Sequence, residues 1–284
     1  MSKRHQSISS NNDTGLSHFF LPEHTFSKGS GQVGSLVELD DAATTHQLMH
    51  VLRIKLGDLV RLLDGKGNMW QAKVCRISRS TVTFALLELL ADAQTRNLSK
   101  YQVISALPLL KGPRFEWALE KLTELNVDGI IPFASARTVV KARMKEESEG
   151  RQKRWQNIIK EAAEQSERLL LPVLHHPLAL ADLLATTVSD TSTTLNLLLC
   201  ERDQAPNLVQ YLKAKIGDES TLDSQESFRI VLLGGPEGGF TEEEKELILT
   251  SGFQKVSLGS TILRGETAAI LAAGISSAIA STLD

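Results

Sequence analysis

The chain has 284 residues, of which 42% are hydrophobic and 23% are charged, an ordinary composition for a globular protein long enough for two domains. No stretch approaches the roughly 18 consecutive apolar residues of a membrane helix. Residues 1–17 are polar and lack the apolar segment of a secretory signal, so we expect a disordered tail there. Cys75 and Cys200 have no CxxC partner. Neither a disulfide framework nor a metal site is therefore predicted, and a cytoplasmic protein with reduced thiols is the simplest expectation.

The net charge of −3 conceals an asymmetry. Residues 1–168 carry 24 Lys and Arg against 19 Asp and Glu, whereas residues 169–284 carry 7 against 15. The segment from Arg137 to Arg154 is the most basic, with seven cationic and three acidic side chains. Such a segment is typical of a surface that attracts a polyanion such as nucleic acid. A solvated loop followed by a charged helix face is the alternative.

Residues 18–92 predict a small β-barrel-like unit. Short β-like segments lie at 18–21, 35–39, 58–78 and 81–90, and "DGKG" at 64–67 is a hairpin signal. Residues 43–58 between them predict a short helix that ends near Gly57. His46 and His50 lie four residues apart on it and could contact RNA or pack partly buried. Residues 91–99 are polar and predict a linker.

Residues 98–284 alternate between strand-like and helix-like segments. Apolar strands are expected at 101–110, 129–135, 194–201, 229–235 and 254–259, and helices at 113–126, 149–169, 241–252 and 265–281. The polar stretch 216–227 reads as a surface loop. This alternation predicts an α/β domain with a mostly parallel sheet.

The stretch "LLGGPEGGFTEEE" at 232–244 places four glycines and a proline between a strand and a helix. It matches neither the P-loop nor the dinucleotide fingerprint, because the lysine and the glycine spacing are missing. Thr241 and Glu244 form a capping box, and the acidic first turn already complements the helix dipole. Such a turn suits a neutral or cationic ligand held by backbone groups; a plain tight turn is the alternative.

A second stretch, "SLGSTILRGETAAI" at 257–270, repeats this arrangement with a glycine, Gly259, after an apolar strand. In a parallel sheet such loops gather at the carboxyl ends of the strands, where ligands bind. The two loops could hold an adenine ring and its ribose through main-chain contacts. Arg264 and Glu266 could form a structural ion pair or face a substrate.

Several separated motifs, in the same order, resemble the RsmE family, the bacterial 16S rRNA (uracil-N3)-methyltransferases of the SPOUT class. Both glycine loops resemble its signature loops. Residues 46–67 are similar to its RNA-binding barrel, "EKLTELNVDGIIPFASARTV" to the opening of its catalytic domain, and "RWQNIIKEAAEQSERLLLPVL" to its central helix. The resemblance extends from about residue 18 to the end of the chain.

The resemblance implies a PUA-like barrel over residues 18–92 and a SPOUT α/β domain over residues 98–284, tied in a deep trefoil knot. It also implies a homodimer and S-adenosylmethionine as methyl donor, a sulfonium cation that an acidic turn tolerates. The implied cofactor-binding residues are Leu199, Cys200, Glu201, Gly234, Gly235, Pro236, Glu237, Gly238, Gly239, Leu258, Gly259, Ile262, Leu263 and Arg264.

The chain departs from the family at a few positions. The family often has proline and arginine where Ser260 and Thr261 stand, threonine at Gly265 and glycine at Asn126. A role of that arginine cannot be carried over to this chain. The cofactor expectation remains, because main-chain contacts do not depend on these side chains.

The implied reaction requires uracil N3 to lose a proton, so that two carbonyl oxygens gain negative charge. We expect Arg264 to stabilise that charge, since its guanidinium stays protonated. Glu266 is the candidate base or a partner that orients Arg264. The expected partner is 16S rRNA in the small ribosomal subunit. Its phosphate contacts are predicted at Arg53, Lys55, Arg61, Arg137, Lys141, Arg143, Lys145, Arg151 and Arg154.

Two other functions remain open at this point. One is a SPOUT enzyme that methylates ribose or another base. The other is a non-catalytic assembly factor that binds RNA, an alternative supported only by the altered "LGST" sequence. An NTPase is disfavoured because the phosphate-binding lysine is missing.

Overall fold

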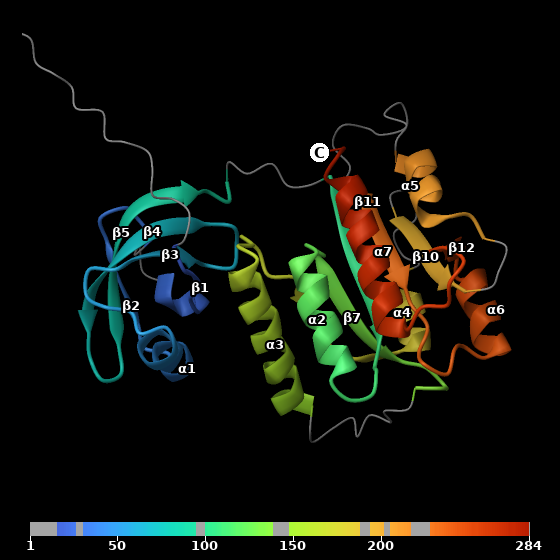
Figure 1. The fold of residues 1–284 in the computed structure, drawn as a ribbon, viewed down its shortest axis with the longest axis horizontal. Coiled ribbons are helices and arrows are strands. Elements are labelled where there is room, and N and C mark those ends of the chain that lie inside the picture. The colour runs from blue at the N-terminus through green and yellow to red at the C-terminus, as the bar shows by residue number, and fades with distance from the viewer. Residues whose placement is uncertain are drawn as a thin grey trace, which may run out of the picture. The chain divides into compact units, whose positions relative to one another are not determined.

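The computed structural model describes residues 16–26, 31–94, 100–138, 148–187, 194–201, 205–216 and 228–283. The chain divides into two compact units, residues 1–96 and 97–284 (Figure 1). No helix within the described residues is long and apolar enough to cross a membrane.

The first unit is a five-stranded sheet in the order β1-β3-β4-β5-β2. Only the β1–β3 pair is parallel among its pairings. A single α-helical turn runs into a π-helical turn, η2, after β2, in the region where one short helix was expected. The strands are His18–Phe20 (β1), Leu36–Leu39 (β2), Leu59–Leu63 (β3), Met69–Ile77 (β4) and Val82–Ala91 (β5), and the short helices are Glu23–Phe26 (η1), Ala42–His46 (α1) and Gln47–Val51 (η2).

Alternation of buried and exposed side chains along β2 and β4 directs one face of this sheet into a core. Phe84 and Leu62 are fully buried in it, and the ring of Phe26 stacks on Trp70 at a centroid distance of 4.8 Å. The predicted hairpin between β3 and β4 is confirmed. Its Asp64 carboxylate accepts hydrogen bonds from the backbone N–H groups of Lys66 and Asn68.

The second unit contains a sheet whose described strands all pair in parallel, in the order β12-β10-β11-β6-β7-β8, with β9 also on β7. This confirms the predicted α/β domain. The strands are Tyr101–Pro108 (β6), Gly129–Ala134 (β7), Val173–Leu174 (β8), Leu178–Ala179 (β9), Thr194–Cys200 (β10), Phe228–Leu233 (β11) and Gln254–Ser257 (β12). The helices are Arg114–Glu124 (α2), Ser148–Gln165 (α3), Leu180–Thr187 (α4), Leu208–Ile216 (α5), Glu242–Thr250 (α6) and Gly265–Ala280 (α7).

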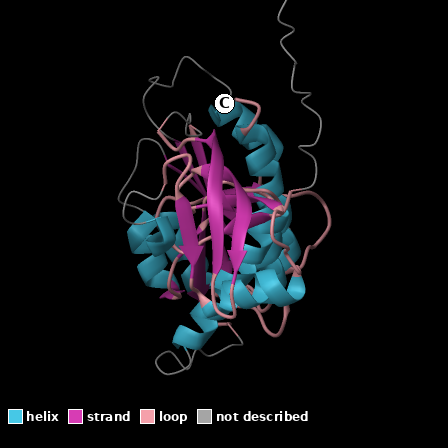
Figure 2. Ribbon diagram, turned by 90° about the vertical axis from the view of Figure 1, so that its left-hand side faces the viewer, coloured by secondary structure: helices cyan, strands magenta, loops and turns pink. Residues whose placement is uncertain are grey.

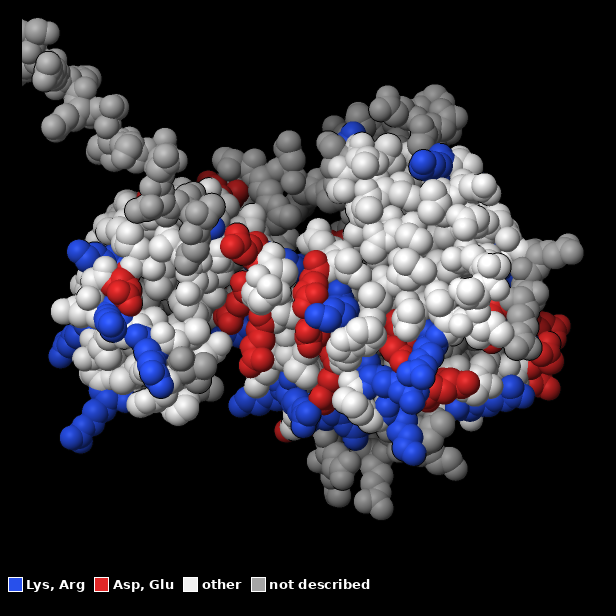
Figure 3. All heavy atoms as spheres, viewed as in Figure 1, with Lys and Arg blue, Asp and Glu red and all other residues white. Residues whose placement is uncertain are grey.

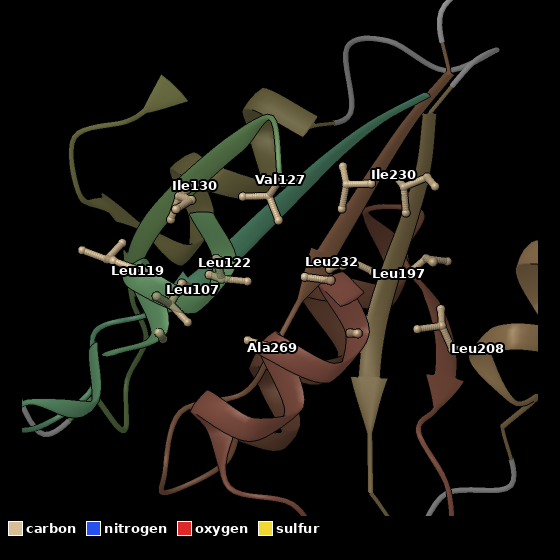
Figure 4. Close-up of a cluster of buried hydrophobic side chains, with 14 of the residues drawn as sticks. Leu107, Leu119, Leu122, Val127, Ile130, Leu197, Leu208, Ile230, Leu232 and Ala269 are labelled. Carbon is tan, nitrogen blue, oxygen red and sulfur yellow. The ribbon is translucent and has the colours of Figure 1, made fainter. Parts of the chain in front are cut away.

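Alternate residues of β11 enter two different cores, so helices cover both faces of the sheet. Ile230 and Leu232 pack with residues of α2, α5 and α7 (Figure 4), whereas Val231 and Leu233 pack with residues of α4 and α6. The helix α7 ends next to the C-terminus (Figure 2). Its small, apolar residues permit a close approach to the strands.

Arg168, in the sequence "SERLL" that directly follows α3, has a structural role. Its buried guanidinium donates to the carbonyl oxygens of Thr123 at 2.8 Å and Val127 at 2.9 Å. The Thr123 carbonyl lies at the end of α2, where it also accepts the N–H of Asn126 at 3.1 Å, and the Val127 carbonyl lies between α2 and β7. Arg168 therefore fixes the end of α2 and the connection that leads into β7.

Candidate functional site

The two glycine loops meet at the carboxyl edge of the second sheet. The strands β12, β10, β11 and β6 are parallel neighbours, so the loops that follow them lie at one edge. A Cβ atom at Gly265 would lie 3.1 Å from the carbonyl oxygen of Gly235, and one at Gly234 would lie 3.9 Å from Leu199 Cδ1. The backbones of the two loops thus approach each other closely, with the end of β10 beside them.

The first loop, defined here as residues 234–240, folds back over its own aromatic side chain. Gly239 has a φ of 67° and donates its N–H to the carbonyl oxygen of Pro236 at 2.9 Å. This left-handed conformation favours glycine. The ring of Phe240 is buried below Gly235 and stacks on Phe133 at a centroid distance of 6.3 Å.

The predicted capping box at the start of α6 is confirmed. The Thr241 hydroxyl accepts the N–H of Glu244 at 3.2 Å, and the Glu244 carboxylate accepts the N–H of Thr241 at 2.9 Å. The other Glu244 oxygen accepts the N–H of Ala136 at 2.7 Å. Hydrogen bonds from its own backbone N–H and from the Thr241 side chain lower the pKa of Glu243. The acidic turn is thus occupied by local contacts, as expected.

Two arginines contact the first loop at different residues. Arg137 Nη1 donates to the carbonyl oxygen of Gly238 at 3.1 Å and to that of Phe240 at 3.5 Å. Glu237 Oε1 accepts from Arg114 Nη1 at 3.1 Å and from the N–H of Lys111 at 3.4 Å. Sequence reasoning missed Lys111 and Arg114. The signal was present, since "KGPR" also follows a strand that ends at this edge.

The second loop, defined here as residues 258–264, makes fewer contacts. Gly259 has a φ of 131°, and its N–H donates to the Ser257 hydroxyl at 3.2 Å. Ser260, Thr261 and Ile262 are exposed, and Leu263 is partly buried. Arg264 is exposed at the N-cap of α7, and its side chain makes no cap hydrogen bond.

Glu266 is buried in the first turn of α7, with only 6% of its side chain exposed. Its Oε1 lies 4.0 Å from Arg114 Nε, and its Oε2 has no hydrogen-bond partner within the described residues. The expected ion pair between Arg264 and Glu266 is therefore wrong. Glu266 turns toward α2, and Arg264 stays at the surface.

The remaining implied cofactor residues lie around the same edge. Cys200 is partly buried at the end of β10, and Glu201 is exposed immediately after it. Pro236 is buried within the first loop, and Leu258 is partly buried where the second loop begins. Among the described residues, no cluster of side chains could hold a metal ion.

The predicted RNA-contact residues are dispersed over both units. Arg53 and Lys55 are exposed, while Arg61 is half-buried with Nη1 3.2 Å from His18 Nε2. His46 and His50 are exposed with ring centroids 4.7 Å apart, so the predicted packing role is wrong. Lys141, Arg143 and Lys145 lie outside the described residues.

Arg151 and Arg154 line a cavity of about 410 Å³ together with Phe115, Glu116 and Trp155. Arg154 Nη2 donates to Glu116 Oε2 at 2.7 Å, and the Arg151 guanidinium lies 5.9 Å from the centroid of the Trp155 ring. Leu109 and Leu110, which directly follow β6, form another wall. The cavity therefore extends from the first turn of α3 to the loop edge.

Comparisons with known proteins agree with this arrangement. A family described as an RNA methyltransferase domain matches residues 97–277, and an RNA methyltransferase PUA domain matches residues 39–87. The ribosomal RNA small subunit methyltransferase E of Synechocystis is 37% identical over 230 residues, 81% of this chain and 69% of that protein. This chain belongs to the RsmE family.

Solved structures of RsmE-like proteins share the fold. The RsmE of Neisseria gonorrhoeae bound to S-adenosyl methionine aligns with a TM-score of 0.73 and 29% identity, covering 95% of this chain and 98% of that one. A putative methyltransferase of Legionella pneumophila in complex with the same cofactor aligns with a TM-score of 0.75 and 28% identity, covering 93% and 98%. The predicted SPOUT fold with a PUA domain is thus confirmed.

Proposed function

We propose that this RsmE-family chain transfers a methyl group from S-adenosylmethionine to N3 of a specific uridine in 16S rRNA of the small ribosomal subunit. The observation that carries the proposal is the meeting of the two glycine loops at the carboxyl edge of the parallel sheet, where Gly265 nearly touches Gly235. Relatives with the same fold are bound to this cofactor.

The residues at this edge fit the cofactor. Gly259 is exposed and has nothing within 4 Å of a Cβ atom built on it, so its backbone is open to a ligand, as main-chain recognition of an adenosine requires. Leu199 supplies an apolar wall, and the buried Glu266 retains an oxygen without a hydrogen-bond partner. When bound, S-adenosylmethionine supplies an electrophilic methyl group on a cationic sulfur. The loops would hold and orient it, and positioning accounts for much of the rate.

The chain's own side chains would manage the proton and the charge on uracil. Arg264 is exposed at the start of α7 and, among the described residues, has no side-chain partner, so its guanidinium is available to the carbonyl oxygens of the base. Such donors stabilise charge that develops in the transition state. Glu266 remains the candidate base for the N3 proton through its free Oε2.

The basic surfaces support an RNA substrate. Arg53 and Lys55 of the barrel are exposed, and Arg151 and Arg154 line a cavity beside the loop edge. Neutralising Lys141, Arg143 and Lys145 to Gln should weaken RNA binding and flatten its salt dependence, because each phosphate contact releases counterions. Unchanged binding in a salt titration would assign this segment to a solvated surface. Lys213→Gln on α5 is a matched control.

A homodimer, a trefoil knot and a cytoplasmic location belong to this proposal. Trp117 of α2, Leu271 of α7 and Ile262 of the second loop are 45%, 40% and 54% exposed. The surface over α7 shows few charges, whereas charged side chains gather along the lower edge (Figure 3). Leu271→Glu should yield a monomer in light scattering, and Leu247→Glu on α6 should leave the oligomer unchanged. A wild-type monomer would contradict the dimer.

The test of the reaction is methyl transfer from labelled S-adenosylmethionine to small subunits that lack their native uracil-N3 methylation. Label at one 16S site as N3-methyluridine is the expected result. Label on ribose or another base would assign the chain to a different SPOUT activity. Binding of cofactor and subunit without transfer would favour the assembly-factor role.

A further inference from the structure

Arg114 connects the two glycine loops from a third segment of the chain. It opens α2, directly after the loop that follows β6. Its Nη1 donates to Glu237 of the first loop at 3.1 Å, and its Nε lies 4.0 Å from Glu266, which follows the second loop. These two carboxylates belong to segments that are held together by the contact between Gly235 and Gly265.

The two carboxylates differ in how well they are satisfied. Glu237 Oε1 also accepts the N–H of Lys111, so it has two donors. Glu266 is nearly fully buried, and Arg114 is the cation that lies beside it among the described residues. A buried carboxylate is costly unless a cation or hydrogen bonds compensate it. Arg114 therefore stabilises the charge of Glu266 while Glu266 Oε2 keeps its acceptor capacity.

We propose that Arg114 is a positioning residue for methyl transfer, an inference that rests on the proposed function. It fixes Glu237 and thereby the first loop, and it lies beside Glu266, whose Oε2 is left to accept a hydrogen bond or the N3 proton of the substrate base. In that step the N3–H bond breaks, an O–H bond forms on Glu266, and the electron pair stays on N3.

The geometry explains why arginine stands here. The guanidinium presents Nη1 and Nε in a fixed planar fork, so one side chain addresses two carboxylates in different directions. A lysine carries its three N–H donors on one nitrogen, so it pairs with two carboxylates only where both lie within reach of that single atom, as Lys121 does with Glu120 and Glu124. Arg114→Lys should therefore retain the contact with Glu237 and lose the hold on Glu266.

The experiment combines Arg114→Gln, Arg114→Lys and Glu266→Gln with the double variant Arg114→Gln/Glu266→Gln. Calorimetry gives the dissociation constant of S-adenosylmethionine, and steady-state transfer to small subunits gives kcat and KM. Lys121→Gln, on the same helix but paired with Glu120 and Glu124, is the matched control. Thermal melting shows which variants are folded.

We expect Arg114→Gln to lower kcat about 30-fold, with KM for the subunit changed less than about threefold, as for a group that acts on the transition state. The double variant should be no slower than Glu266→Gln alone, because the two side chains act as a unit. Arg114→Lys should restore cofactor affinity but only part of kcat.

Additive losses in the double variant, or unchanged kcat in Arg114→Gln, would overturn the proposal. If the wild type transfers no methyl group, the proposed function fails. The same calorimetry still tests whether Arg114 connects the two glycine loops. Cofactor affinity should then fall in Arg114→Gln and recover in Arg114→Lys. An unchanged cofactor affinity in Arg114→Gln would overturn the positioning role as well. If Arg114→Gln does not fold, Arg114→Lys supplies the same comparison of kcat with affinity.

Discussion

The two glycine loops share a position in the fold but differ in how they are held. The first loop is fixed by hydrogen bonds from Arg137 and Arg114 and is followed by the capping box of α6. The second loop has a local hydrogen bond to Ser257, and most of its side chains are exposed. On the proposed function, the first loop is therefore a preformed surface for the cofactor, whereas the second loop presents the exposed Ile262 and Arg264 to a ligand, an RNA or a partner subunit.

This difference predicts that changes in the second loop affect turnover and binding, whereas changes in the first loop affect folding stability. The contacts of the first loop form during folding and are part of the domain's structure. The contacts of the second loop should form largely with the ligand, RNA or partner subunit that binds to it.

The largest effect is expected for Arg264→Ala. The variant should lose about 100-fold in kcat, the typical effect of removing a donor that stabilises transition-state charge. Its thermal midpoint and cofactor affinity should match the wild type, since the side chain makes no cap hydrogen bond. Single-turnover transfer is the measurement, with Lys213→Ala as control. Full turnover would remove Arg264 from the mechanism.

Alanine substitution of one glycine in each loop should show how the two loops differ. Gly239 and Gly259 have positive φ values of 67° and 131°, and nothing lies within 4 Å of a Cβ atom built on either. Alanine is therefore strained at both positions without a steric clash. Strain of this kind costs about 1–3 kcal/mol.

Gly259→Ala should weaken cofactor binding roughly tenfold with an unchanged thermal midpoint, because the open loop can change conformation to relieve strain of about 1.4 kcal/mol. Gly239→Ala should lower the midpoint instead, because the anchored loop cannot relax. Calorimetry and thermal melting of both variants check the prediction. Equal effects of the two changes would show that the loops do not differ in this way.

The smallest effect is expected for Thr241→Ala. Loss of the capping hydrogen bond should lower the free energy of unfolding by about 1 kcal/mol, with no change in kcat. Thr250→Ala at the other end of α6, where the hydroxyl bonds back to Glu246, is the control and should cost less. Urea denaturation measures both. A large loss of turnover in Thr241→Ala would mean that the cap serves catalysis.

The features that sequence predicted are those with a local cause. The capping box at Thr241, the hairpin after β3 and the strands around the glycine loops follow from neighbouring residues, and all are confirmed. The helices α4 and α5, each little more than two turns long, were missed, whereas the equally short α6 was predicted because its capping box marks its start. Their formation depends on packing against the sheet rather than on propensity.

The features that sequence did not predict are long-range. Arg114 and Glu237 are 123 residues apart, and only the parallel order of β6 and β11 brings them together. The spacing of Arg264 and Glu266 suggested a local pair, but the first turn of α7 directs Glu266 inward to Arg114. The partner of a buried charge is determined by tertiary packing, and a local sequence pattern does not specify that packing.

The most direct test of this account is hydrogen exchange of the amides in residues 234–240 and 258–264, with and without S-adenosylmethionine. The account predicts that exchange slows in both loops on binding, and that the change is larger in the second loop. Unchanged exchange in both loops, with binding verified by calorimetry, would contradict the assignment of the cofactor to this edge of the sheet.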